Sequence, residues 1–290
     1  MTPATTVPSA MPALSGASGG TLPPLFTTAV TATAVLGCLA YLAAAARLRA
    51  RGDAWPYGRD ALFCAGGVVL VAGVAEPWGA APPFTAHMLT HLCVGMVAPL
   101  LLVLGRPLTL TLRTAPVPVR RVLVALTRSR WAALPVLPPV AALLDFGGLW
   151  LLYRTPLLSV SHHNPWLNTA VHVHILLAGL AFSFGLLALD PVRHRPGFGL
   201  RAAVLLAAGT AHAVLAKSLY AAGPPGTSFG AADLHLASQV MYYGGDAVEL
   251  ALAAVVACRW YRAEGRALRR ARRAGRPAPC GTTTAAVTRS

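Results

Sequence analysis

Two histidines one helical turn apart stand at the start of a long apolar stretch, residues 84–107. His87 and His91 are four positions apart, so on a helix they share one face. Such a pair can grip one metal ion or the edge of one flat cofactor. Because ionisable groups inside a bilayer are costly and usually functional, the pair predicts a binding site rather than an isolated polar contact.

Most other histidines are predicted to lie in the same layer as this pair. Connecting segments rich in Lys and Arg usually face the cytoplasm. With that orientation, every histidine except His194 falls outside the membrane or in its outer part. At about 1.5 Å rise per residue, His91, His172 and His212 each lie roughly 10–14 Å inside the outer helix ends. Asp145 falls at a similar depth. One shared polar pocket would keep all these groups away from lipid.

The predicted metal ligands share this outer location. They are His87, His91, His172 and His212, with His235 at the rim of the pocket. Additional candidates are His174, Asp145, Asp246, Glu249 and Met88. His174 lies two positions from His172, about 200° around a helix, so the two rings cannot face one point. We expect His162 and His163 to be exposed residues of an outer loop.

A second polar pattern runs along the last apolar segment. His235, Gln239, Tyr242, Asp246 and Glu249 recur with helical periodicity, so they predict one polar face from the outer surface to beyond mid-membrane. Asp246 and Glu249 are not expected to face lipid as anions. This face indicates either a proton relay or metal path, or a structural polar network.

The elements that position these residues are predicted to be membrane-spanning helices. The chain of 290 residues is 56% hydrophobic and only 11% charged, with a mean hydropathy of +0.59, whereas a soluble domain carries about 25% charged residues. Seven apolar segments approach the roughly 20 residues needed to span a bilayer. They cover residues 24–47, 60–77, 84–104, 132–153, 166–189, 201–221 and 234–258. We therefore predict an all-α, polytopic seven-transmembrane-helix bundle.

Basic residues in the connecting segments predict its orientation. All of the 24 basic residues except Arg154 and Lys217 lie in the first, third and fifth loops or in the C-terminal tail. Because cytoplasmic loops are enriched in Lys and Arg, the N-terminus is predicted outside and the C-terminus inside. Residues 1–23 are expected to form a disordered extracytoplasmic tail, residues 24–260 the membrane domain, and residues 261–290 a basic cytoplasmic tail.

The net charge of +15 is explained by this topology without nucleic acid. Arginines concentrated on the cytoplasmic side attract anionic membrane lipid, so lipid is the expected partner of the tail. The five cysteines are scattered and form no CxxC motif, which argues against a disulfide framework or a zinc site. We find no nucleophile arrangement and no zinc-protease motif, so we expect no enzyme and no small-molecule substrate.

Three sequence blocks, in order, carry a family resemblance. They read HMLTHLCVGMVAPLLLVLGRPLTL, HNPWLNTAVHVHILLAGLAF followed by ALDP, and QVMYYGGDAVELALA. Together they resemble the CtaG family of cytochrome c oxidase assembly proteins, most closely its actinobacterial type. His87, His91, His172, His174, Asp246 and Glu249 fall within these blocks. Asn164 and Asn168 stand where the resemblance leads us to expect histidine.

The resemblance implies a seven-span protein of the cell membrane that helps to build the oxidase, with an oxidase subunit as partner and copper as cargo. The residue chemistry is compatible with copper, because imidazole suits copper and thioethers suit Cu(I). Core packing is nevertheless the simpler role for Met88. We therefore predict an assembly factor that binds or delivers Cu(I) through a histidine-rich site at the outer face.

Two other function classes remain open from the residues alone. Histidines on facing helices could be axial ligands of haem in an electron-transfer protein. Alternatively, Asp246 and Glu249 could carry protons in a proton-coupled transporter.

Overall fold

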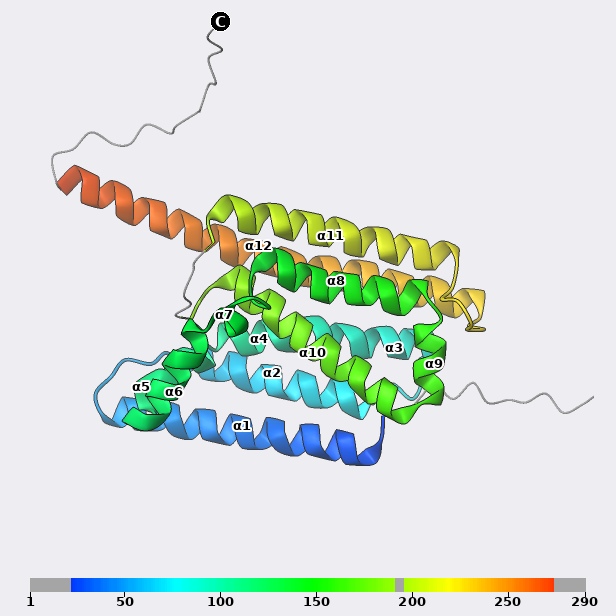
Figure 1. Ribbon diagram of the computed structural model, residues 1–290, viewed down its shortest axis with the longest axis horizontal. Helices are drawn as coiled ribbons and strands as arrows, with labels where there is room; N and C mark the ends of the chain where they lie inside the picture. The colour runs from blue at the N-terminus through cyan, green and yellow to red at the C-terminus, as the bar shows by residue number, and fades with distance from the viewer. Residues whose placement is uncertain (1–21, 191–195, 274–290) are drawn as a thin grey trace, which may run out of the picture.

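The protein is a bundle of long helices that run side by side (Figure 1). The structure is a computed structural model and describes residues 22–190 and 196–273, which contain no strand. Residues 1–21 of the predicted disordered tail therefore lie outside the described residues. His194 and the end of the basic tail, residues 274–290, also lie outside them.

Long helices alternate with short ones along the chain. Their bounds are α1 Pro24–Ala50, α2 Tyr57–Ala75, α3 Pro83–His91, a π-helix Leu92–Val97, α4 Ala98–Leu104, α5 Pro107–Thr114, α6 Val117–Arg128, α7 Arg130–Ala133, α8 Pro138–Arg154, α9 Leu157–His163, α10 Pro165–Leu187, α11 Phe198–Ala221 and α12 Ala231–Arg273. Helix α12 continues well beyond the last predicted span, and its basic end projects from the bundle.

Six helices in the described residues are long and apolar enough to cross a membrane. They are α1, α2, the continuous run Pro83–Thr114, α10, α11 and the apolar part of α12. The fourth predicted span, residues 132–153, is represented by α8, which has only 17 residues. Helix α8 begins at Pro138 because proline fits the first helical turn but not the helix interior. It packs against α10 and α11, and its outer face, with Leu143 and Leu151, is exposed.

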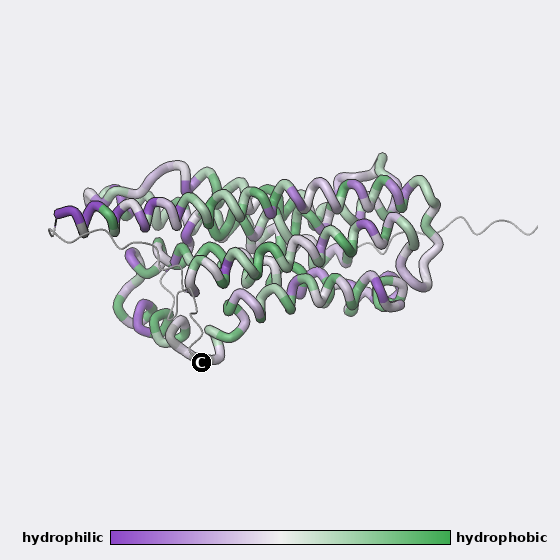
Figure 2. The backbone as a smooth tube through the Cα atoms, turned by 90° about the horizontal axis from the view of Figure 1, so that it is seen from above, coloured by the Kyte–Doolittle hydropathy of each residue, from purple (hydrophilic) through white to green (hydrophobic). Residues whose placement is uncertain are grey.

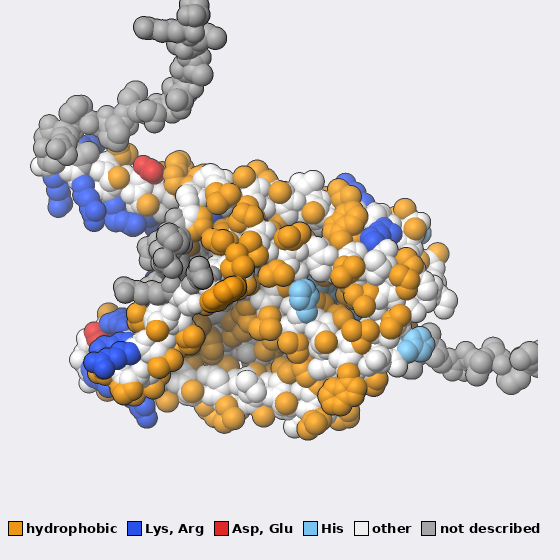
Figure 3. Space-filling model, in the orientation of Figure 1, with side chains coloured by type: hydrophobic (Ala, Val, Ile, Leu, Met, Phe, Trp, Pro, Cys, Tyr) orange, Lys and Arg blue, Asp and Glu red, His pale blue; other side chains and the backbone are white. Residues whose placement is uncertain are grey.

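The outer surface of the bundle is apolar over most of its length. Large side chains such as Leu36, Leu177 and Leu206 are exposed, and hydrophobic residues follow the long helices (Figures 2 and 3). Lys and Arg gather at one end, on α5, α6 and the projecting end of α12 (Figure 3). A broad apolar surface with charge at an end is characteristic of a membrane protein.

Two buried aspartates hold helix N-termini from distant parts of the chain. Asp233 of α12 accepts hydrogen bonds from the backbone N–H groups of Phe84 (2.9 Å) and Thr85 (2.8 Å) at the start of α3. Asp190 accepts one from the backbone N–H of Thr109 in α5 (2.9 Å). A carboxylate satisfies the N–H groups that an α-helix leaves unpaired in its first turn. These contacts fix both ends of the run that carries His87 and His91.

A π-helical segment follows His91 directly. Pro99 has no N–H, so it cannot bond the carbonyl of Gly95. That carbonyl instead faces Gly179 of α10, where an added Cβ would lie only 1.9 Å from the Gly95 oxygen. Ala98 bonds Cys93, five residues back. The π-helical segment thus depends on the close approach of the Gly95 carbonyl to α10, which only glycine at position 179 permits. Such π-helical segments are frequent at functional sites.

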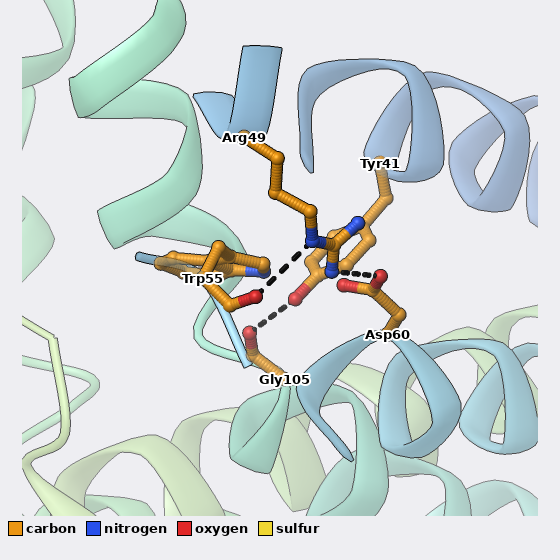
Figure 4. A network of polar contacts seen from close by, with 5 residues as sticks. All are labelled: Tyr41, Arg49, Trp55, Asp60 and Gly105. Atoms are coloured by element: carbon orange, nitrogen blue, oxygen red, sulfur yellow. Dashed lines mark hydrogen bonds and ion pairs between the residues drawn. The ribbon is translucent and has the colours of Figure 1, made fainter. Parts of the chain in front are cut away.

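A polar network joins α1, α2 and the end of α4 at the basic end of the bundle (Figure 4). The Tyr41 hydroxyl donates to the carbonyl of Gly105 at 2.7 Å. Arg49 donates to the carbonyl of Trp55 at 3.1 Å and forms an ion pair with Asp60. The Tyr41 bond anchors the turn between α4 and α5, and the Arg49 bonds tie the end of α1 to the start of α2.

Candidate histidine site

Four of the predicted ligands meet inside the bundle. His87 and His91 extend from α3, His172 from α10 and His212 from α11. The ring centroids of His87 and His172 are 6.4 Å apart, and those of His91 and His212 are 6.3 Å apart. The histidines predicted to share one pocket therefore lie together, as two adjacent pairs contributed by three helices.

His91 is the most isolated polar group of this cluster. Its side chain is buried, and neither ring nitrogen has a hydrogen-bond partner among the described residues. Leaving a buried polar group unpaired is costly, so such a group commonly serves a ligand, an ion or water. His91 thus has free nitrogens to offer where His212 approaches it.

His212 is oriented by Glu249 of α12. Its Nδ1 lies 3.0 Å from Glu249 Oε1. An ionised carboxylate can only accept, so Nδ1 carries the proton and Nε2 keeps its lone pair. Nε2 is buried and has no partner among the described residues. This is the arrangement by which a carboxylate prepares an imidazole for metal binding.

His172 is prepared in the same way by the backbone. Its Nδ1 donates to the carbonyl of Asn168 at 2.9 Å, which leaves Nε2 with the lone pair. Asn164, the other asparagine where histidine was expected, caps α10, and its side chain accepts from the N–H groups of Trp166 and Leu167. The Asn164 side chain therefore has a structural role next to the site, whereas Asn168 contributes its backbone carbonyl.

Two residues not predicted as ligands complete the cluster. The Tyr153 hydroxyl of α8 lies 3.1 Å from His87 Nε2. His162, expected in an exposed loop, is half-buried on α9, with its ring centroid 5.9 Å from that of His87. Burial, together with the charges of His163 and His172, lowers the pKa of His162 and favours its neutral form. Tyr153 is eight positions from Asp145, a helical spacing that could have indicated a shared face.

Both carboxylates of the predicted polar face lie at one groove, and the buried Asp145 of α8 lies near one of them. Glu249 and Asp246 line a groove of about 590 Å³ between α11 and α12. Glu249 also reaches inward to His212, so it connects this groove with the buried cluster. Asp145 of α8 is buried and close enough to Glu249 for their charges to interact.

The remaining candidates lie apart from the cluster. His235 is exposed and stacks on Tyr220, with ring centroids 4.0 Å apart. His174 is exposed, and its Nε2 donates to the carbonyl of Leu144 at 3.1 Å. Met88 is fully buried within the main hydrophobic core. Within the described residues, no three His, Cys, Asp or Glu side chains stand close enough to hold a metal ion together.

Long apolar helices around a buried histidine cluster define a polytopic helical membrane protein. A family model described as cytochrome c oxidase caa3 assembly factor matches residues 39–263, and the chain belongs to this family. Membership confirms the resemblance seen in the three sequence blocks.

Relatives in mycobacteria extend this comparison. Uncharacterized proteins of Mycobacterium tuberculosis and Mycobacterium bovis are each 32% identical over 205 residues, covering 67% of this chain and 31% of the relative. An uncharacterized protein of Mycobacterium leprae is 32% identical over 206 residues, with the same coverage. The chain thus spans about a third of the length of these relatives. No solved structure matches.

Proposed function

We propose that this protein assists cytochrome c oxidase assembly by holding Cu(I) at its buried histidine cluster and passing it to an oxidase subunit. The observation that carries the proposal is the pairing of His91 with His212. Both rings are buried, they meet edge-on with centroids 6.3 Å apart, and each has a nitrogen without a partner among the described residues.

The donor set fits copper in its chemistry. Imidazole is a good copper ligand, and Cu(I) tolerates low coordination numbers, so a pair of histidines is an adequate beginning of a site. His91 and His212 would hold the ion, and His87 and His172 would receive it next. Bound copper would be the cargo. Glu249 would keep His212 in the metal-binding tautomer, and Tyr153 would orient His87.

This function requires a defined topology in the cell membrane. We propose seven spans, with α8 as the additional one, the N-terminus outside and the C-terminus in the cytoplasm. At 17 residues, α8 matches the lower limit of about 17 residues for a span. The histidine cluster then lies towards the outer face. The basic end of the bundle faces the cytoplasm, where its arginines contact anionic lipid.

The proposal is tested by metal analysis of the purified protein together with its absorption spectrum. Wild-type protein loaded with Cu(I) should retain copper, and His91→Ala should lose most of it and lower the level of assembled oxidase in cells. His163→Ala is the matched control, because His163 is exposed and its ring bonds the carbonyl of Ser159 in its own helix. Equal copper and equal oxidase in both variants would refute the proposal, while a Soret band would indicate haem instead.

A further inference from the structure

A second pocket lies at the basic end of the bundle, apart from the histidine cluster. It has a volume of about 610 Å³, within the range of small-ligand sites. Five arginines line it, Arg106, Arg201, Arg259, Arg262 and Arg266, together with Trp260 and a single carboxylate, Glu264. These side chains come from the start of α5, the start of α11 and the projecting part of α12.

The arginine charges are poorly compensated within the described residues. No ion pair there involves Arg106, Arg201, Arg262 or Arg266. Arg201 donates to the carbonyl of Leu186 at 3.3 Å, but its Nε is buried without a partner in the described part of the chain. Asp190 attracts Arg106 electrostatically, but together with Glu264 it sets two carboxylates against the five arginines here. A concentration of like charge of this kind favours an anionic ligand.

The backbone around the pocket is strained at two positions. Arg106 has φ 53° and Ala188 has φ 43°, both in the left-handed region that side chains with a Cβ rarely adopt. Glycine would adopt either conformation at lower cost. Arg106 occupies the turn between α4 and α5, and the carbonyl of Ala188 accepts from Arg259 at 3.1 Å. Strain retained next to a charged pocket is typical of a functional position.

An aromatic wall completes the site. Trp260 stacks on Phe198, with ring centroids 4.9 Å apart. Both residues line the pocket, and Trp260 is exposed. The pocket thus combines several guanidinium groups with an apolar surface. A phosphate group with an attached apolar chain satisfies both features, because arginine binds phosphate oxygens with paired hydrogen bonds.

We infer that this pocket binds the phosphate group of an anionic phospholipid. The aromatic wall of the pocket and its place at the basic end of the bundle favour a lipid headgroup as the source of the phosphate. Basic pockets between helices on the cytoplasmic side of membrane proteins recognise such headgroups. The site is independent of the histidine cluster, and it would tie the projecting helix α12 to the membrane surface.

The test measures how much phosphatidylglycerol the detergent-purified protein retains, by native mass spectrometry, with phosphatidylcholine as the neutral comparison. Wild-type protein should retain phosphatidylglycerol selectively, and the double variant Arg106→Gln/Arg201→Gln should retain it at least about tenfold less. The control is Arg120→Gln/Arg121→Gln, which removes the same charge from exposed positions on α6. Equal losses in both variants would show nonspecific attraction and overturn the proposal.

Two further measurements keep the result interpretable. Arg262→Gln changes an exposed position that cannot disturb the core, and it should still weaken lipid retention. A titration with pyrophosphate tests whether a soluble phosphate binds the pocket. The signal is the tryptophan fluorescence of the wild type minus that of Trp260→Phe. Response to pyrophosphate without lipid retention would support phosphate binding and reject the lipid source, whereas no response to either would overturn the site. Copper content should be unchanged in every variant.

Discussion

The buried His212 and the half-buried Glu249 form a pair in which each side chain rests on a glycine of the opposite helix. Their atoms Nδ1 and Oε1 are 3.0 Å apart. A Cβ at Gly245 of α12 would lie 2.0 Å from His212 Cε1, and a Cβ at Gly209 of α11 would lie 2.3 Å from Glu249 Oε2. The close approach of α11 and α12 therefore depends on these two glycines, and it fixes the direction of the imidazole.

Gly245→Ala should displace the His212 ring, because the added methyl group overlaps it. We expect a loss of about 1–3 kcal/mol in stability from overpacking, and a loss of bound Cu(I) close to that of His212→Ala. Thermal unfolding in detergent and copper analysis measure the two effects. Gly37→Ala is the control, since nothing lies within 4 Å of its added Cβ. Normal copper content in Gly245→Ala would contradict the proposed role of His212.

Glu249→Gln preserves the size of the side chain but removes the charge that supports the Nδ1–H tautomer. Loss of such a partner to a metal-binding histidine weakens metal affinity by about 10–100-fold. Competition with a Cu(I) chelator measures this effect. Asp246→Asn is the matched change in the same groove, and it should have little effect, because Asp246 has no described bond to a histidine. The reverse order of effects would place the ligand site elsewhere.

Asp233→Asn should weaken the attachment of α3 to α12. An amide has only one acceptor oxygen, so its NH₂ group would face one of the N–H donors of Phe84 and Thr85. We expect a loss of roughly 1–3 kcal/mol, measured as a lowered thermal midpoint. Asp53→Asn breaks the exposed ion pair with Arg113, which is worth at most about 1 kcal/mol. A larger effect at Asp53 would disprove the capping role of Asp233.

Stability should depend on pH through Asp190, which lies outside the spans. Burial raises the pKa of this carboxyl, although the Thr109 bonds and the Arg106 charge act in the opposite direction. The folded state therefore binds the proton more tightly than the unfolded state, and the contribution is present below about pH 4 and lost as pH rises through the folded pKa. Asp190→Asn should flatten this decline at pH values above about 4. Parallel thermal-midpoint curves for wild type and variant would exclude Asp190 as the cause.

Reporter fusions decide between six and seven spans. With α8 as a span, a reporter inserted between α8 and α9, at Thr155, should be active outside, and one fused after residue 276 should be active only in the cytoplasm. A reporter within residues 222–230 should also be active outside. Cytoplasmic activity at Thr155 would show that α8 does not cross the membrane, and the proposed orientation would then fail.

The helical class and the apolar segments could be predicted from local sequence, and the grouping of the histidines by membrane depth stays a prediction. Hydrophobic length and the four-residue spacing of His87 and His91 are local properties, which survive any arrangement of the helices. The fourth segment was predicted to begin at residue 132, but α8 begins at Pro138, so the helix is shorter than predicted. Family membership also followed from contiguous blocks of sequence.

Which groups meet was settled by packing between helices. Packing selected His172 for the cluster and turned His174 outward, folded α9 back so that His162 approaches His87, and brought Glu249 to His212. It likewise gathered Arg106 and Arg262, more than a hundred residues apart, around one pocket. The rotation of a helix about its own axis is set by contacts with all its neighbours, including the glycine contacts of α11 with α12. Sequence periodicity shows which residues share one face of a helix, but the packing of the helices determines which residues that face contacts.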